Sequence, residues 1–213
     1  MSRWIGKFPS LKLERMVGYQ SAIERDFIYL LDFDPAVTTY KEQPMTISYL
    51  DGGKQRGYTP DFSIVLNNRT YLAECKHHQF LQEEVNGLKW RAARRWCSTH
   101  GATFHVVTDT RIRAGYRLKN VKLLTDYARY PASDATTLGV LSAAAVSANQ
   151  LTVTDLLQAL SPMPPPKALA TILHLAYRQV LFIPLDETPI TKASPVSVFQ
   201  PAARYDTLQT MWG

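Results

Sequence analysis

The 213 residues are 46% hydrophobic and 11% aromatic, enough apolar material for a packed core in one large domain or two smaller ones. The apolar runs fall well short of the roughly 20 residues that cross a membrane, and the first fifteen residues contain no signal-peptide core, so we expect a cytoplasmic protein. Cys75 and Cys97 are the only cysteines, which excludes a disulfide scaffold and predicts two free thiols.

The net charge of +6 is unevenly distributed along the chain. Residues 1–131 contain 20 Lys and Arg against 13 Asp and Glu, a net charge of +7, whereas residues 132–213 contain 4 against 5, a net charge of −1. A basic region attracts polyanions, so the first part favours a nucleic-acid ligand, with solubility alone as the alternative explanation. The composition also changes near residue 131, where we place a domain boundary that gives domains of residues 1–131 and 132–213.

The predicted elements of the first domain follow the order helix, strands, helix, strand. Residues 21–31 begin with a Ser-x-x-Glu pattern and have apolar residues at helical spacing, so they predict a helix that ends before Asp34. Turn signals then separate segments that predict a β-meander, over residues 38–40, 45–50, 58–66 and 70–76. A helix over residues 80–99 and a strand over residues 103–108 complete an α/β order.

The two strands around Asn67 and Asn68 carry the most informative pattern. If these two residues form the turn, residues that face each other across the hairpin have numbers that sum to 135, which pairs Asp61 with Glu74. Lys76 points to the same face because side chains alternate along a strand. Two carboxylates held together are unfavourable unless something neutralises them. The pattern therefore predicts a site for a hard divalent cation, Mg²⁺ or Mn²⁺, beside an ammonium group.

Such a site suits the hydrolysis of a phosphodiester, in which a metal activates water and stabilises negative charge. Lys76 can orient the attacking water or stabilise the developing charge as a point cation. The opposite face of the hairpin is apolar and suits burial, as Phe62, Ile64 and Leu66 illustrate. The alternative is an exposed hairpin with ordinary solvated charges.

The pattern Pro60-Asp61, twelve residues and then Glu74-Cys75-Lys76 resembles the PD-(D/E)xK nuclease superfamily. Flanking segments narrow this resemblance: residues 21–24, 30–35, 40–44, 57–62 and 106–109, together with Asn120. In order and spacing, these segments look like the TnsA family, the endonuclease subunit of heteromeric, cut-and-paste bacterial transposases. The resemblance covers roughly residues 15 to 130, and the C-terminal part more loosely.

The resemblance implies a restriction-endonuclease-like nuclease core. In that core Glu24, Asp61 and Glu74 would be catalytic and bind the metal, and Lys76 would be the catalytic lysine. Glu24 also has a simpler explanation, because it occupies the position of a capping-box Glu.

The same resemblance implies a biological role, which is cleavage of the 5′ strands of double-stranded DNA at transposon ends. A DDE transposase subunit would handle the 3′ ends, and an AAA+ ATPase regulator would be a further partner. The alternatives are a stand-alone restriction or repair nuclease and a non-catalytic DNA-binding assembly module.

Basic side chains near this pattern are candidates for contacts with the DNA backbone. On the helix over residues 80–99 they lie mostly off the apolar stripe, which leaves a solvated helix face as the alternative. His77 directly follows Lys76 and either contacts phosphate or merely ends a strand; no Cys/His spacing suggests zinc. The DNA-binding candidates are Lys89, Arg91, Arg94, Arg95 and His77.

The second domain has the element order of a winged helix. Helices over residues 134–148, 154–160 and 167–178 enclose a short extended segment at 151–153, and strands at 180–185 and 197–199 follow. Thr154 is the predicted cap of the second helix. The candidate recognition helix has only Lys167, His174 and Arg178 as basic groups, and the resemblance likewise implies a winged-helix domain used largely for assembly.

Overall fold

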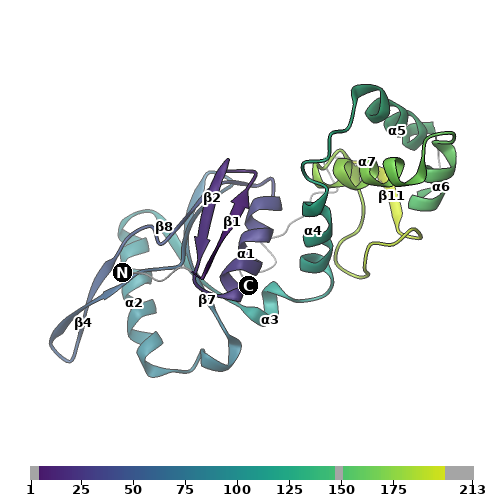
Figure 1. Cartoon of the computed structure of the whole chain (residues 1–213). Helices are drawn as coiled ribbons and strands as arrows, with labels where there is room; N and C mark the ends of the chain where they lie inside the picture. The colour runs from purple at the N-terminus through teal and green to yellow at the C-terminus, as the bar shows by residue number, and fades with distance from the viewer. Residues whose placement is uncertain (1–4, 147–150, 200–213) are drawn as a thin grey trace. The chain divides into compact units, whose positions relative to one another are not determined.

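The computed structural model describes residues 5–146 and 151–199, which divide into two compact units (Figure 1). The division falls between Arg113 and Ala114, upstream of the predicted boundary at residues 131 and 132. Helix α4 (Arg117–Asp126) accounts for the difference, because it packs against α7 (Pro165–Tyr177) of the second unit. The change in composition near residue 131 follows the end of α4, whereas the division between the two packed units lies before α4 begins.

This division also changes the distribution of charge. Among the described residues, 5–113 contain 15 Lys and Arg against 12 Asp and Glu, a net charge of +3, and 114–199 contain 7 against 5, a net charge of +2. The basic residues of α4 and of the turn after it belong to the second unit. Both units are therefore basic, and the expectation that all excess positive charge lies in the first is wrong for the units that fold together.

The first unit is built on a four-stranded sheet with the strand order β3-β6-β7-β8. Strands β3, β6 and β7 run antiparallel to one another, while β8 runs parallel to β7 after a crossover through α2 (Glu84–Thr99). With α1 (Ala22–Phe33) the sheet gives the predicted α/β class. The strands are β3 (Val37–Glu42), β6 (Phe62–Leu66), β7 (Arg69–Lys76) and β8 (Ala102–Thr108).

The hairpin of β6 and β7 has the predicted register. Asn67 and Asn68 form its two-residue turn with φ values of 48° and 60°, a left-handed conformation that asparagine tolerates better than most residues. Phe62 pairs with Ala73, and each further pair has numbers that sum to 135. The prediction is confirmed up to this pair, which is the last one of the ladder.

Helices cover both faces of the sheet. Phe62 contacts Phe27 of α1 edge to face, with ring centroids 5.7 Å apart. Leu72 points to the opposite face, because its neighbour Ala73 is the cross-strand partner of Phe62. On that face a buried cluster joins the sheet to α2: Ile47, Tyr58, Leu72, Trp90, Ala93, Cys97 and Phe104.

The predicted meander is wrong in one respect. Strands β4 (Ile47–Asp51) and β5 (Lys54–Tyr58) form a two-stranded hairpin of their own, which projects from the sheet (Figure 1). The strand predicted over residues 58–66 is interrupted between Tyr58 and Phe62. Pro60 lies in this gap and has no N–H to donate to a ladder, which explains the break.

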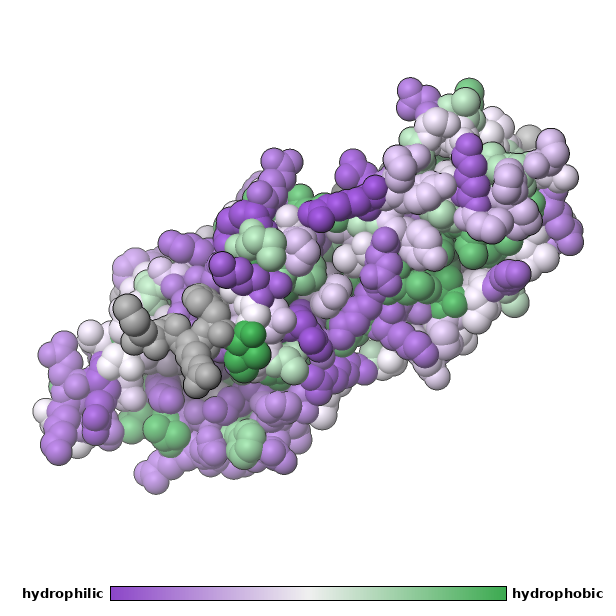
Figure 2. Space-filling view, viewed as in Figure 1, coloured by the Kyte–Doolittle hydropathy of each residue, from purple (hydrophilic) through white to green (hydrophobic). Residues whose placement is uncertain are grey.

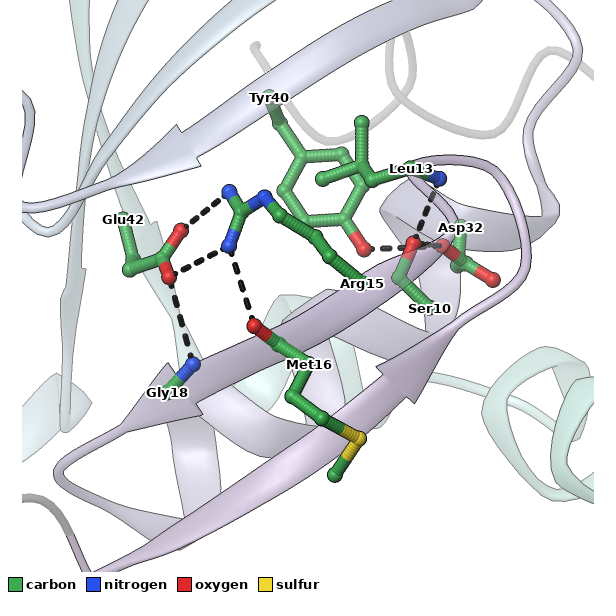
Figure 3. A network of polar contacts seen from close by, with 8 residues as sticks. All are labelled: Ser10, Leu13, Arg15, Met16, Gly18, Asp32, Tyr40 and Glu42. Carbon is green, nitrogen blue, oxygen red and sulfur yellow. Dashed lines mark hydrogen bonds and ion pairs between the residues drawn. The ribbon is translucent and has the colours of Figure 1, made fainter.

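The structure contains an N-terminal hairpin that was not predicted. Buried hydrogen bonds attach it to the rest of the first unit (Figure 3). Its strands are β1 (Gly6–Ser10) and β2 (Arg15–Tyr19). The Asp32 carboxylate of α1 accepts hydrogen bonds from the Ser10 hydroxyl, from the Leu11 N–H at 3.0 Å and from the Tyr40 hydroxyl at 2.9 Å. One buried carboxylate thus joins three elements that lie far apart in the sequence.

Two basic side chains complete this attachment. Arg15 of β2 forms a bidentate ion pair with Glu42 of β3, with both N–O distances at 2.7 Å (Figure 3). Lys12 donates to the backbone carbonyls of Asp34 and Val37. Burial lowers the pKa of Lys12 to about 8, against the opposing influence of Asp34 and Asp32. The β1–β2 hairpin is thereby held against both ends of the edge strand β3, at Val37 and at Glu42.

The described residues of the second unit form four helices and a three-stranded sheet of order β10-β11-β9. Besides α4 and α7 its elements are α5 (Asp134–Val146), β9 (Leu151–Thr152), α6 (Val153–Ala159), β10 (Leu181–Phe182) and β11 (Pro195–Val198). The predicted end of the first helix, at residues 147–148, lies outside the described residues.

Two details of the second unit differ from the predictions or were missed. Thr152, not Thr154, caps α6, because Asp155 at the third helical position completes a capping box with Thr152. Asn120 of α4 is buried, and its side chain forms hydrogen bonds with the backbone of Leu185, Thr188 and Ile190.

In the part of the chain that the structure describes, no helix has the length and apolar character of a membrane span.

The Asp32 network gives a test of how the N-terminal hairpin is held. We expect Asp32→Ala to lower the free energy of unfolding by about 2–4 kcal/mol, because the Ser10 and Tyr40 hydroxyls, both buried, lose their shared acceptor. Tyr40→Phe removes one of the three bonds and should cost about 1 kcal/mol. Urea denaturation measures both values, and an Asp32→Ala protein as stable as the wild type would contradict the role of the network.

Candidate active site

Asp61 lies directly after Pro60, one residue before β6 begins. The β6–β7 ladder ends at Phe62, so Asp61 is not the ladder partner of Glu74 that the register predicted. Its carboxylate instead reaches across to β7 and accepts the backbone N–H of Cys75 at 2.7 Å. Its backbone carbonyl accepts the N–H of Gln43 at 2.8 Å. Asp61 is therefore held between the end of β3 and the C-terminal end of β7.

Glu74 lies on β7, on the same face as Leu72, and its Oε2 accepts a hydrogen bond of 2.7 Å from the Tyr58 hydroxyl. Tyr58 is the last residue of β5 and is 5% exposed. Sequence reasoning did not propose it as a site residue, although it lies in segment 57–62, which carried the family resemblance. The local pattern gave no signal, because β5 and β7 are separate in the sheet order.

The electrostatics of the two carboxylates agree with a shared site. Burial raises the pKa of Asp61 well above its usual range, and the charges of Glu74 and Glu24 raise it further, against the Cys75 N–H and Lys76. Burial also raises the pKa of Glu74, while the Tyr58 hydrogen bond, Lys76 and Lys89 oppose the change. The region thus holds more negative charge than the side chains around it compensate.

Glu24 fulfils its simpler role as a cap. Ser21 caps α1 and accepts the N–H of Glu24 at 3.2 Å, while the Glu24 carboxylate accepts the Ser21 hydroxyl and the Gln20 N–H, both at 2.8 Å. The buried Glu24 still raises the pKa of both Asp61 and Glu74 through its charge. It therefore lies near the pair, with both of its oxygens already engaged in the cap.

Lys76 is the predicted catalytic lysine and lies two residues beyond Glu74, at the end of β7. Its Nζ is 3.8 Å from Glu83 Oε2 and 6.0 Å from the centre of the Phe80 ring. Its charge lowers the pKa of both Asp61 and Glu74, which places it electrostatically beside them. Lys76 thus lies between the carboxylate pair and the residues that precede α2.

The donor chemistry of the site fits a hard divalent cation. Across residues 5–146 and 151–199, no three His, Cys, Asp or Glu side chains are arranged closely enough to hold a metal ion. Asp61 and Glu74 nevertheless supply oxygen donors with an uncompensated charge, which a cation would neutralise. Each Glu24 oxygen accepts one capping hydrogen bond, and Glu24 adds its negative charge to the same region.

The DNA-binding candidates do not form one group. Arg91, Arg94 and Arg95 are exposed on α2, whereas Lys89 is half-buried and lowers the pKa of Glu74 by its charge. At about 100° per residue, Lys89 points roughly opposite to Arg91, so the two face different surroundings. Lys89 therefore belongs with the carboxylates rather than with the arginines.

His77 is exposed but has a partner, which is Asp109 at the start of α3 (Asp109–Ile112), with 3.0 Å between Nδ1 and Oδ2. The same carboxylate accepts the His78 N–H at 2.8 Å. These two contacts, the His78 bond first, lower the pKa of Asp109 to about 2. These contacts join the end of β7 to the residue that follows β8. The two roles considered for His77, a phosphate contact and a strand end, did not include this connection.

The raised pKa of Asp61 predicts a dependence of stability on pH. Because the folded protein holds a proton on Asp61 more tightly than the unfolded chain, whose carboxyl has an ordinary pKa near 3.8, the free energy of unfolding should fall as pH rises above this value. In metal-free buffer at neutral pH, Asp61→Asn should be more stable than the wild type, because the amide carries no charge that burial and the neighbouring carboxylates would disfavour.

Thermal or urea denaturation between pH 4 and 8 tests this expectation. Asp51→Asn is the matched control, since Asp51 lies on the projecting β4–β5 hairpin with 43% of its side chain exposed. A wild-type protein whose stability follows that of Asp61→Asn across the whole range would contradict the repulsion inferred here.

Comparison with known proteins gives one family match, and it lies within the first unit. Residues 34–109 match the family model described as TnsA-like endonuclease N terminal, a segment that includes Asp61, Glu74 and Lys76 but not Glu24. A search of the curated proteins found no match. The resemblance to the TnsA family that the sequence motifs indicated is confirmed over this segment. Residues 34–109, which lie within the first unit, are therefore similar to the N-terminal domain of TnsA-like endonucleases.

Proposed function

We propose that the protein is a metal-dependent DNA endonuclease whose active site contains Asp61, Glu74 and Lys76. The observation that carries the proposal is the pair of mutually repelling carboxylates beside an ammonium group, within the segment that matches a TnsA-like endonuclease domain. Two adjacent carboxylates destabilise the folded state, and strain of this kind is often found at functional sites. A bound hard cation would neutralise their charge.

Asp61 and Glu74 are the residues that would hold Mg²⁺, or Mn²⁺ in vitro. When bound, such a cation supplies an activated water and stabilises negative charge on a phosphodiester. The Tyr58 hydroxyl and the Cys75 N–H each engage one oxygen and orient these carboxylates. Glu24 would act mainly through its charge, or as a third ligand after releasing Gln20 or Ser21.

Lys76 would act on the phosphate or on the attacking water. Its contact with Glu83 is long, at 3.8 Å, and both side chains are partly exposed, so the pair holds Lys76 only weakly. The ammonium group is therefore available to a substrate that brings its own negative charge.

We further propose the biological setting that the family implies. The substrate would be the 5′ strands at transposon ends, cleaved beside a DDE transposase subunit, with an AAA+ ATPase regulator as an additional partner. The TnsA-like endonuclease match supports this setting over a stand-alone restriction or repair nuclease. The carboxylate pair supports a catalytic role over a purely structural assembly module.

The second unit is proposed to be a winged-helix domain that serves mainly in assembly. Its described elements follow the order α5, β9, α6, α7, β10 and β11, and β11 pairs with both other strands, which supports that fold. Helix α7 is the candidate recognition helix, but seven of its residues are buried. Its basic residues are few, so protein contact suits this unit better than reading of base sequence.

Substitution of Lys76 should separate chemistry from metal binding. We expect Lys76→Ala to reduce cleavage of duplex DNA by at least roughly 100-fold, because a charge-stabilising or water-orienting group is lost, while Mn²⁺ binding is retained. Asp61→Asn should lose both cleavage and Mn²⁺ binding, because it removes a ligand charge. Isothermal titration with Mn²⁺ and a cleavage assay in Mg²⁺ measure the two properties.

Lys41→Ala is the matched control, since Lys41 is an exposed lysine on β3 in the same unit. It should leave both properties unchanged. Cleavage by Asp61→Asn at the wild-type rate would sink the assignment of the active site. Equal loss of Mn²⁺ binding in Lys76→Ala and Asp61→Asn would instead contradict their separate roles.

A further inference from the structure

The β4–β5 hairpin extends beyond the core that supports it. Its first pair, Ile47 and Tyr58, is buried in the cluster that α2 covers. The outer part has no such cover, since Lys54, Gln55 and Arg56 are all exposed and Leu50 is 70% exposed. Figure 1 shows this hairpin projecting away from the four-stranded sheet. Tyr49 still packs against this cluster, so the two outermost pairs, Leu50 with Gln55 and Asp51 with Lys54, extend past the core by roughly 7 Å at about 3.4 Å per residue.

Folding alone does not explain such an extension. A two-stranded hairpin is marginally stable in water, and its outer pairs here bury little apolar surface. A short loop in place of the outer part of the hairpin would be enough to connect β3 to β6. The tight turn at Gly52 and Gly53, both with positive φ, keeps the two strands paired to the tip. The hairpin is therefore built to remain extended.

The outer part of the hairpin is polar and basic on one face. Tyr49, Asp51, Lys54 and Arg56 follow Ile47 and Tyr58 on the face directed at α2, because the pairs of the ladder alternate between faces. Figure 2 shows hydrophilic residues gathered over this projecting end of the molecule. Arg56 has only a long contact with Asp51, at 3.7 Å, so its charge is weakly compensated.

The base of the hairpin contacts the candidate active site. Tyr58 ends β5 and donates its hydroxyl to Glu74, and β4 packs against α2, which presents Arg91, Arg94 and Arg95 to solvent. A polyanion held by Lys54 and Arg56 would therefore be held in a fixed relation to the carboxylate pair. The same polyanion could reach the arginines of α2.

On the basis of the proposed nuclease function, we propose that the β4–β5 hairpin is a DNA-contacting arm, in which Lys54 and Arg56 bind phosphates of the duplex that leads into the active site. Duplex DNA is the occupant that suits these side chains, because its phosphates complement the two cations. The contacts are to the backbone, so the arm would position the duplex without selecting a base sequence.

The test is the doubly substituted full-length chain, Lys54→Ala with Arg56→Ala. Binding to a duplex oligonucleotide, followed by fluorescence anisotropy across a salt series without divalent metal, should be weaker than for the wild type. The slope of log K against log salt should fall by about 2, since about 0.9 is lost with each phosphate contact. With Mg²⁺ present, the KM for cleavage should rise while kcat stays near that of the wild type.

Lys119→Ala with Arg129→Ala is the matched control, because it removes two exposed cations from the second unit and lowers the net charge equally. The arm is refuted if both double variants change the salt slope alike, or if the hairpin variant binds and cleaves DNA as the wild type does. Thermal unfolding and Mn²⁺ titration of the hairpin variant should match the wild type. If the wild type itself cleaves no duplex, the nuclease function fails instead, whatever the two salt slopes show.

Discussion

The burial of two like-charged side chains, Asp61 and Glu74, is the constraint to which the candidate site of the first unit is adapted. Helices bury both faces of the sheet, so charged side chains are confined to the ends of its strands. At that position the Cys75 N–H and the Tyr58 hydroxyl each hold one carboxylate in place. The unit thus stabilises a concentration of negative charge by directed hydrogen bonds, without placing a compensating cation directly between the two groups.

The parts of this arrangement that were predictable have short-range causes. The turn at Asn67 and Asn68, together with the alternation of apolar residues on either side, fixed the register of the β6–β7 hairpin. Contacts made over long separations were not predictable in the same way. The bond of Tyr58 to Glu74 and the sharing of Asp32 by Ser10 and Tyr40 depend on where whole elements pack, which no local period records.

The difference between the predicted domain boundary and the division of the structure after Arg113 has the same origin. Composition changes after Pro131, but the buried Asn120 side chain attaches α4 to residues 185–190, more than sixty positions further along the chain. The charges of α4 therefore belong to the second unit, and both units are basic. Net charge therefore does not distinguish the two units, and the position of each cation relative to the candidate active site becomes the relevant property.

The mixed direction of the central sheet bears on the order in which the site forms during folding. The antiparallel β6–β7 hairpin closes over only two residues, while the parallel pairing of β7 with β8 requires the intervening α2 segment to close as a much longer loop. The two carboxylates would then meet before α2 covers their face and before Glu83 reaches Lys76.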